Sequence, residues 1–305
     1  MDLWQLNIFC KVVEKRSFSK AGQAVHLSQP TVSSHIKDLE AHFRCQLIDR
    51  LSTAAVPTPA GELLYGYAKR MLSLKTEMAS ALSEFLGTIT GHLTIGGSTI
   101  PGNYILPGLM GKFSAHYPDV RMSLVVEDTA AIVGHVVRGD IEVGLVGGKT
   151  DDAGIAQDVF IEDDMALVVP AGHPLAARSA VTLAELHNAP FIIRESGSGT
   201  RQSFEECLRA AGHAVDRLAV VAEMGSTEAV IQAIRGGLGV SILSRLAVSD
   251  ACGGGQLKAL SIRGVDLKRH FYLTRHRHRT LSPTSRAFVD FLTAIPPDQR
   301  SPQSR

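Results

Sequence analysis

Three short segments rich in glycine and hydroxyl side chains have the composition of anion-binding loops. Each joins a strand-like apolar run to a helix-like one: GGSTIPGNYILP at 96–107, RESGSGTRQSF at 194–204 and MGSTEAVIQAI at 224–234. Free amides and the dipole at a helix N-terminus favour an anion, although each loop alone could be a simple capped turn. Together they predict a pocket for a small anion or carboxylate, lined by Ser98, Thr99, Ile100, Pro101, Ser196, Gly197, Ser198, Gly199, Thr200, Ser226 and Thr227.

The same loops lack the motifs of common catalytic sites. Gly148-Lys149-Thr150 is similar to the end of a phosphate-binding P-loop, but the required first glycine falls on Val143. Neither ESGSGT nor GGSTIPG fits the G-x-S-x-G nucleophile elbow, and the sequence has no His-Glu metal motif. A small-molecule transferase using ESGSGT would also lack an acid, a base and a nucleophile. We therefore expect no enzyme, no cofactor and no metal site.

The elements that must position these loops alternate between strand and helix patterns. From about residue 90, apolar runs such as HLTIGGS, RMSLVVE, MALVVP and PFIIRE alternate with helix-like segments. This alternation is typical of α/β layers with mainly parallel strands. In open α/β sheets, ligands collect outside the carboxyl ends of the strands, where the three loops fall.

The first fifty residues have a helix-turn-helix pattern. Apolar residues from Leu3 to Val13 predict a first helix, and a second follows a Ser17 or Ser19 cap, with Ala21, Ala24 and Val25 facing inward and its end near Leu27. Ser28 and Pro30 can begin a third helix, 29–42, with Val32, Ile36 and Leu39 buried. The outward residues of such a helix can contact DNA in the major groove. The predicted contact set is Ser28, Gln29, Pro30, Thr31, Ser33, Ser34, His35, Lys37 and Arg50.

A turn-rich wing and a long helix are expected next. LSTAAVPTPAG could form the wing, and the periodic segment from Ala60 to about Leu86 has Leu64, Met71, Met78 and Phe85 seven residues apart, with Tyr67, Leu74 and Ala81 between them. An isolated helix of this kind is marginally stable without a partner. We expect a dimerising coiled-coil seam; packing on its own domain is the alternative.

Composition bounds the remaining possibilities. The net charge of +1 excludes a protein surface that is basic throughout, so contact with DNA must come from a few specific side chains. The N-terminus lacks a secretory signal pattern and no run of about 18 apolar residues occurs, so a cytoplasmic protein without membrane contact is expected. Cys10, Cys45, Cys207 and Cys252 are scattered, which indicates neither a disulfide framework nor a zinc site.

These residues resemble the LysR-type transcriptional regulators along the whole chain. The marks are SFSKAGQAVHLSQPTVSSHIKDLE, LIDR followed by TPAG at 58–61, and AVIQAIRGGLGVSILSR at 229–245. The resemblance implies a winged helix-turn-helix (1–59), a dimerising linker helix (60–89) and an effector-binding domain (90–305) of two Rossmann-like subdomains, like those of periplasmic binding proteins. It places subdomain I at about 90–163 and 267–305, and subdomain II at about 164–266.

The resemblance also implies partners and a site. The partners are a double-stranded DNA operator, a small anionic effector, further copies of the chain in a homodimer or homotetramer, and RNA polymerase if the protein is an activator. The pocket lies between the subdomains, and Gly147 joins the loops above. The position of Ser34 commonly holds arginine, and the wing sequence STAAV lacks the usual basic residues. STIPGNYILP with ESGSGTR is similar to the branch tied to sulfur assimilation, and the N-terminal run MDLWQLNIFCKVVE with AVHLSQPTVSSHIKDLE is similar to regulators linked with selenium metabolism.

Two other functions remain open from the sequence. The C-terminal part could be a solute receptor for transport, although its attachment to a helix-turn-helix and the lack of a secretory signal weigh against this. A redox switch through Cys207 and Cys252 is the other, although no basic environment that would activate these thiols is visible in the sequence.

Overall fold

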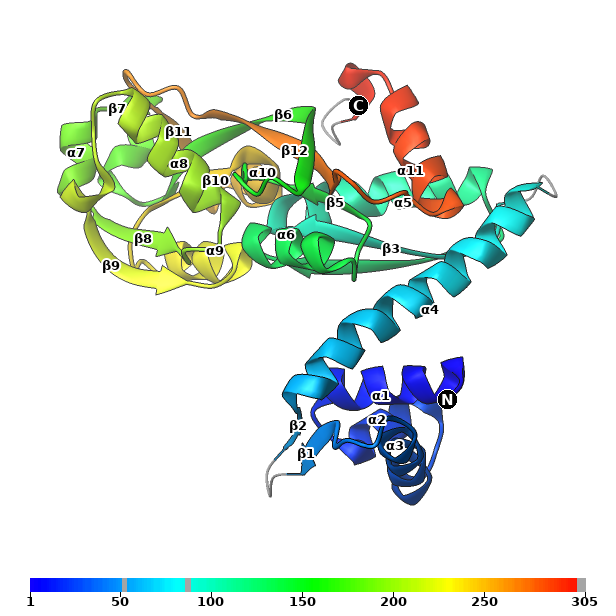
Figure 1. The fold of residues 1–305 in the computed structure, drawn as a ribbon. Helices are drawn as coiled ribbons and strands as arrows, with labels where there is room; N and C mark the ends of the chain where they lie inside the picture. The colour runs from blue at the N-terminus through cyan, green and yellow to red at the C-terminus, as the bar shows by residue number, and fades with distance from the viewer. Residues whose placement is uncertain (51–53, 86–88, 301–305) are drawn as a thin grey trace. The chain divides into compact units, whose positions relative to one another are not determined.

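The structure, a computed structural model, describes residues 1–50, 54–85 and 89–300 of the 305-residue chain. The chain divides into an N-terminal unit, residues 1–88, and a C-terminal unit, residues 89–305 (Figure 1). The long helix that follows the wing is therefore part of the N-terminal unit.

The N-terminal unit consists of short helices, a β-hairpin and one long helix. Asp2 and Gln5 form a capping box at its first helix, and Ser17 and Ser28 cap the next two, each accepting a bond from a backbone amide. The hairpin strands are antiparallel, with Arg50 opposite Ala55. The elements are α1 (Leu3–Lys15), α2 (Phe18–Val25), α3 (Gln29–Phe43), β1 (Ile48–Arg50), β2 (Ala55–Pro57) and α4 (Pro59–Phe85).

Helix α2 ends earlier than the sequence pattern predicted. His26 adopts the left-handed conformation, with φ of 57°, and stops the helix at Val25. Ala24, predicted to face inward, is exposed, so that prediction was wrong. Gly22 takes the inward place, because a Cβ there would lie 2.6 Å from the carbonyl oxygen of Leu27. The backbone itself thus makes the close contact that a small side chain was expected to provide.

The long helix α4 uses only part of its apolar surface within its own unit. Ala68 is buried and Leu64 packs against the helix-turn-helix core. Leu63, Tyr67, Met71, Leu74, Met78 and Leu82 are exposed. Packing on its own domain therefore accounts for the start of the helix. The side chains of Ala81 and Phe85, which were assigned to the predicted seam, lie outside the described residues.

The first lobe of the C-terminal unit contains parallel strands, as predicted, but the long strands that join it to the second lobe pair antiparallel, which the sequence pattern did not predict. Strand β3 (Gly91–Ser98) lies between β4 (Val120–Glu127) and β5 (Val143–Val146), and both pairings are parallel. The π-helix η1 (Pro101–Ile105) leads directly into α5 (Leu106–His116). The other helices of this lobe are α6 (Thr129–Arg138) and α11 (Pro283–Ala294), and the short η4 (Pro297–Gln299) follows α11.

Two long strands connect this lobe to a second one. Strands β6 (Ile155–Pro170) and β12 (Lys268–His276) run antiparallel to each other, and Figure 1 shows them passing between the lobes. The sequence pattern found only the last part of β6, as MALVVP. The sheet order is β4-β3-β5-β12-β6-β11-β7, in which β11 is Leu257–Ile262 and β7 is Ala180–Val181. Strand β10 (Ser241–Ser244) also pairs with β6. We infer that the boundary between the lobes falls near residues 163 and 267, where these two paired strands pass from one lobe to the other.

The second lobe has a smaller parallel pair of strands and its own helices. Strands β8 (Pro190–Arg194) and β9 (Ala219–Met224) are parallel. Strand β11 (Leu257–Ile262), which no predicted run covered, is antiparallel to β6. The remaining elements are η2 (Pro174–Ala177), β7 (Ala180–Val181), α7 (Leu183–His187), α8 (Gly199–Ala210), η3 (Val215–Arg217), α9 (Thr227–Arg235), β10 (Ser241–Ser244) and α10 (Arg245–Gly253).

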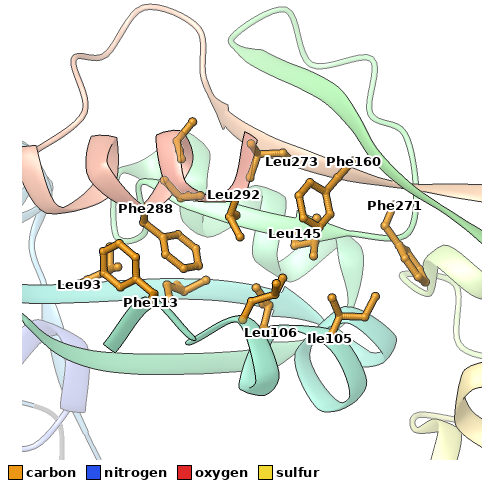
Figure 2. Close-up of a cluster of buried hydrophobic side chains, with 14 of the residues drawn as sticks. Leu93, Ile105, Leu106, Phe113, Leu145, Phe160, Phe271, Leu273, Phe288 and Leu292 are labelled. Atoms are coloured by element: carbon orange, nitrogen blue, oxygen red, sulfur yellow. The ribbon is translucent and has the colours of Figure 1, made fainter. Parts of the chain in front are cut away.

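Separate hydrophobic cores hold the two lobes. In the first lobe, the rings of Phe113 and Phe288 meet edge to face, with centroids 5.1 Å apart. Figure 2 shows these two rings at one end of the cluster and Phe271 at the other. In the second lobe, Phe191 and Phe204 stack with centroids 5.7 Å apart. The surface between two independently packed lobes is thus free to be polar.

Candidate DNA-binding surface and effector cleft

Helix α3 separates a buried apolar face from an exposed polar one. Val32, Ile36 and Leu39 are fully buried, as their spacing predicted. At its N-terminus, the Ser28 hydroxyl accepts a bond from the Thr31 amide and lies 2.7 Å from the Thr31 hydroxyl. Of the predicted DNA contacts, Ser33 and His35 are half-buried, and the others on or beside the helix are exposed: Ser28, Gln29, Pro30, Thr31, Ser34 and Lys37.

Arg50 connects the wing to this polar face. Its Nη1 donates to the Ser33 hydroxyl over 3.0 Å, and its guanidinium lies 4.8 Å from the centre of the Phe18 ring. Arg50 stays exposed, so a charged group stands beside the start of α3. The wing residues 51–53, which include part of the STAAV segment, lie outside the described residues.

A hydrogen-bonded link between α3 and the turn before the wing was not predicted from the sequence. One carboxylate oxygen of Glu40, Oε1, accepts bonds from the amides of Leu47 and Ile48, at 2.9 and 3.3 Å. These bonds fix the turn that leads into β1. Nδ1 of His35 is buried and has no hydrogen-bond partner within the described residues, so this ring nitrogen faces away from the exposed surface.

A small cleft lies between the two lobes of the C-terminal unit. Its empty space is about 210 Å³, a figure that includes solvent at the open mouth of the cleft. From the predicted set it is lined by Ser98, Thr99 and Ile100 after β3, Gly147 after β5, and Ser198, Gly199 and Thr200 at the start of α8. The carboxyl ends of the strands and the N-terminus of α8 thus meet there, as the loop positions predicted.

The other predicted effector residues lie outside the lining of this cleft. Pro101 is the first residue of η1, Ser196 is exposed, and Gly197 accepts a backbone bond from Ala130. Ser226 caps α9, and the buried hydroxyl of Thr227 accepts a 2.6 Å bond from Arg194. The third loop therefore has the simple capping role that was its alternative.

Direct bonds join the lobes around the cleft. Arg194 of the second lobe donates to the Thr99 hydroxyl over 3.4 Å. The Ser203 hydroxyl donates to the Gly147 carbonyl over 3.2 Å, and the Ala130 amide donates to the Gly197 carbonyl over 3.4 Å. The structure thus represents a closed arrangement of the lobes.

Four lining residues were absent from the sequence prediction: Asp128, Thr129, Arg269 and Phe271. Asp128 and Thr129 follow β4, so the rule that ligands gather at the carboxyl ends of strands could have found them. Arg269 lies on the apolar strand β12 and is only 5% exposed. A charged residue within a buried strand was the signal available for it.

Arg269 is the centre of a buried polar network. Its Nε donates to Asp163 over 2.8 Å, and its Nη1 donates to the Thr200 hydroxyl over 3.0 Å. The other carboxylate oxygen of Asp163 accepts a 2.7 Å bond from Ser244. This network joins the crossing strands β6 and β12 to α8 and to the end of β10.

The cysteines lack the features of an activated redox pair. Burial raises the pKa of the Cys207 thiol, and nearby Asp266 and Glu206 raise it further. Burial also raises the pKa of Cys252. Both thiols therefore stay protonated at neutral pH, which disfavours attack by a thiolate.

Within the described part of the chain, no helix is long and apolar enough to cross a membrane, and no metal-binding cluster of His, Cys, Asp or Glu is found.

Both units match known protein families. Residues 3–62 match the family described as "Bacterial regulatory helix-turn-helix protein, lysR family", and residues 87–295 match "LysR substrate binding domain". The chain belongs to the LysR family. It is a DNA-binding transcriptional regulator whose C-terminal α/β domain binds a small effector.

Curated relatives and solved structures agree with this assignment. The probable RuBisCO transcriptional regulator of Cyanidioschyzon merolae (strain NIES-3377 / 10D) is 32% identical over 287 residues, 93% of this chain and 95% of that protein. The regulator CysL of Bacillus subtilis (strain 168) is 31% identical over 264 residues, 87% of each. CbnR complexed with its target DNA has the same fold, with a TM-score of 0.70 at 21% identity, covering 96% of this chain and 99% of that one.

The solved relatives include regulatory domains with a small ligand bound. The regulatory domain of CcmR from Synechocystis PCC6803, in complex with 2-PG, is 28% identical with a TM-score of 0.61. The match covers 67% of this chain and 97% of that domain.

Proposed function

We propose that this regulator binds an operator through α3 and the wing, and that a small anionic effector in the interlobe cleft controls the response. The observation that carries the proposal is the cleft itself, because residues from both lobes line it and bonds across it join them. A ligand that prefers the closed arrangement shifts the population toward it. This gives the effector a route to the DNA-binding state.

The contact set at the DNA follows from the exposed face of α3. Gln29, Thr31, Ser34 and Lys37 are exposed around the helix start, with Arg50 beside them. Hydroxyl and amide side chains reach base edges and phosphates, while lysine and arginine add attraction to the phosphate backbone. CbnR, which has the same fold, was solved on its target DNA.

The exposed stripe on α4 supports assembly through this helix. Tyr67, Met71, Leu74 and Met78 are spaced as on one helix face. A second α4 would cover that stripe, giving a homodimer that can pair further into a tetramer. Two recognition helices in one assembly would then read two half-sites.

The identity of the effector and its pathway belong to the same proposal. The resemblance of the loop sequences to regulators of sulfur assimilation supports sulfur or selenium oxyanions. The CcmR domain with bound 2-PG supports a small organic anion instead. A redox response through Cys207 and Cys252 is disfavoured by their raised pKa values. If the protein activates transcription, RNA polymerase is a further partner.

The test combines ligand binding with DNA binding on the full-length protein. A thermal-shift panel of sulfate, sulfite, thiosulfate, selenite, O-acetylserine, phosphate and 2-PG should identify a compound that raises the melting temperature, because a ligand of the folded state stabilises it. Selection from random DNA then yields the operator. Thr99→Ala should abolish the ligand shift and leave operator binding intact. Thr293→Ala, on α11, is the matched control and should change neither.

Two results would contradict the proposal. Failure of the full-length protein to select any DNA sequence would overturn operator binding. An unchanged ligand shift in both Thr99→Ala and Thr200→Ala would mean that the effector binds elsewhere.

A further inference from the structure

Two polar atoms in the cleft are buried without a hydrogen-bond partner in the described part of the chain. They are Nη2 of Arg269 and the hydroxyl oxygen of Thr129. Each residue is only 5% exposed, and both line the cleft. Buried polar groups are nearly always paired, because an unpaired one loses its bonds to water without replacement. The unpaired atoms therefore indicate a partner that joins them from outside the chain.

The chemistry of these atoms specifies the partner. A guanidinium N–H only donates, and the other two arms of Arg269 are already occupied by Asp163 and Thr200. The Thr129 hydroxyl can donate as well. Helix α8 adds backbone amides, because its N-cap Ser198 makes no side-chain capping bond. A partner that accepts bonds from all three presents several oxygen acceptors, and the cationic guanidinium among the donors favours an oxyanion.

The charges around the cleft disfavour a highly charged ligand. Asp163 already neutralises Arg269 at 2.8 Å. Asp128 also lines the cleft, with one carboxylate oxygen accepting a bond from the Ala131 amide. Each further negative charge on the ligand would be repelled by the Asp128 carboxylate. The cleft is small, so few atoms beyond the oxyanion itself can enter it.

The position of these donors connects the ligand to the lobes. Thr129 begins α6 of the first lobe, and Gly199 begins α8 of the second. A Cβ on Gly199 would lie 2.6 Å from the Thr129 hydroxyl and 2.7 Å from the Gly147 carbonyl carbon. The two helix starts are thus in direct contact at the cleft, and Arg269 on the crossing strand β12 adjoins both through Thr200.

We propose that Arg269 and Thr129 are the specificity-determining residues of the effector cleft, and that they bind the oxyanion of a small carboxylate, phosphate or sulfur oxyacid between α6 and α8. This inference rests on the proposed function of the cleft as an effector site and assigns its chemistry. The bound oxyanion replaces the missing partners of both residues and holds the lobes together. The negatively charged effector in this way stabilises the closed arrangement of the two lobes.

The decisive variant is Thr129→Val, which has the same shape without the hydroxyl. Because the hydroxyl is unpaired in the free protein, its removal should leave the melting temperature unchanged or raise it. The same variant should bind the active anion about ten- to a hundredfold more weakly, the range for losing one hydrogen bond to a charged group. Thr129→Ser, which restores a hydroxyl, should recover most of the affinity.

A matched control separates this result from a general effect on packing. Thr284 is a buried threonine at the start of α11, and its hydroxyl lies 3.3 Å from that of Ser282. Thr284→Val should lower the melting temperature and leave anion affinity unchanged. The two valine variants are thus expected to show opposite patterns of stability and binding.

Arg269 needs a variant that keeps the buried charge pair. Arg269→Lys retains a cation for Asp163 and removes the free Nη2. It should weaken anion binding by at least tenfold while operator binding without ligand stays intact. If Arg269→Lys fails to fold, the double variant Asp163→Asn, Arg269→Gln removes both charges and makes the same prediction for binding.

The probes are sulfate, sulfite, phosphate, acetate and 2-PG, each titrated into the full-length protein. Inorganic and organic arms distinguish a free oxyanion from one carried on a carbon chain. If no probe raises the melting temperature while operator binding persists, the oxyanion assignment is overturned and the regulator remains. If Thr99→Ala loses the response but Thr129→Val and Arg269→Lys bind as wild type, the cleft stands and the assigned residues are wrong.

Discussion

The hydroxyl groups on helix α3 and those in the interlobe cleft are the same chemical groups in opposite environments. Ser28, Thr31 and Ser34 are exposed, and Ser28 bonds to Thr31 within its own helix turn. Thr129 and Thr200 are buried, and the Thr129 hydroxyl has no partner among the described residues. An exposed hydroxyl satisfied by its neighbours or by water has no unmet bond before a macromolecule arrives. A buried, unpaired one costs stability until a small ligand fills the site.

The comparison extends to the charged groups beside the hydroxyls. Arg50 lies at the surface and contacts Ser33 and the Phe18 ring, so little desolvation accompanies its contacts. Arg269 is buried with Asp163, and the side chains of this pair are 3% and 1% exposed. Loss of one partner should therefore have a large effect in the cleft and a small one at the DNA surface.

The largest expected effect is that of Asp163→Ala. It leaves Arg269 buried without its counter-ion, and such changes cost about 3–5 kcal/mol. The C-terminal unit should lose this much stability in urea unfolding followed by far-UV circular dichroism. Fluorescence of Trp4, the only tryptophan, reports the N-terminal unit and should change little.

A surface pair on the same two strands is the control for Asp163. Asp158 of β6 bonds to Arg275 of β12 over 3.0 Å, with side chains 61% and 39% exposed. Asp158→Ala should cost no more than about 1 kcal/mol, as exposed pairs do. Equal losses in the two variants would contradict the buried role of the Asp163 pair.

The next effect is expected from Glu40→Ala in the N-terminal unit. It removes the carboxylate that holds the Leu47 and Ile48 amides, and bonds to a charged group contribute about 1.5–3 kcal/mol. The loss should appear in the Trp4 unfolding transition and should be accompanied by weaker operator binding, because the wing loses its anchor. Glu40→Gln keeps an acceptor and should lose less. Asp38→Ala, at an exposed position of the same helix, should be nearly neutral; a comparable loss there would make the effect one of helix charge.

Gly199→Ala tests the close contact of the lobes. The new Cβ would collide with the Gly147 backbone, so α8 must move away from the first lobe. Overpacking of this kind costs about 1–3 kcal/mol. We expect reduced melting temperature and reduced ligand shift together, with operator binding in the absence of ligand retained. Gly212→Ala is unsuitable as a control because its φ is 78°; Gly172→Ala, with open space around its Cβ, is suitable and should leave the ligand shift unchanged.

The sequence predicted features within a single helix or loop better than contacts between residues that are far apart in the chain. The buried face of α3 follows from the spacing of Val32, Ile36 and Leu39, which is fixed by a single helix. The end of α2 was missed because His26 adopts a left-handed conformation that its residue type does not require. Strand-end loops at Ser98 and Thr200 were found because each carries its own turn and cap signals.

The charged centre of the cleft could not be found in that way. Arg269 meets Thr200 and Asp163 only after the second lobe has folded between them, since they are 69 and 106 residues away. The apolar pattern around Arg269 predicts a strand but does not identify the residues that bond to the Arg269 side chain. Ser226 and Thr227 show the reverse case, because their sequence matches the other loops while the fold uses them as a cap and as a partner of Arg194. Equal loop composition therefore does not mean equal role.

The smallest effect on stability is expected from Ser33→Ala on the exposed face of α3. The Ser33 hydroxyl accepts a 3.0 Å bond from exposed Arg50, so its loss should change the free energy of unfolding by no more than about 0.5 kcal/mol. Operator affinity should fall by about five- to tenfold, because a hydrogen bond at the DNA is lost and Arg50 is no longer held. Binding assays with the selected operator and with unrelated DNA distinguish these contributions: Ser33→Ala should weaken the specific complex more, whereas Arg50→Ala should weaken both and lower the salt dependence. Thr129→Val is expected to affect ligand and not DNA, so a variant from either surface that affected both equally would remove the distinction between them.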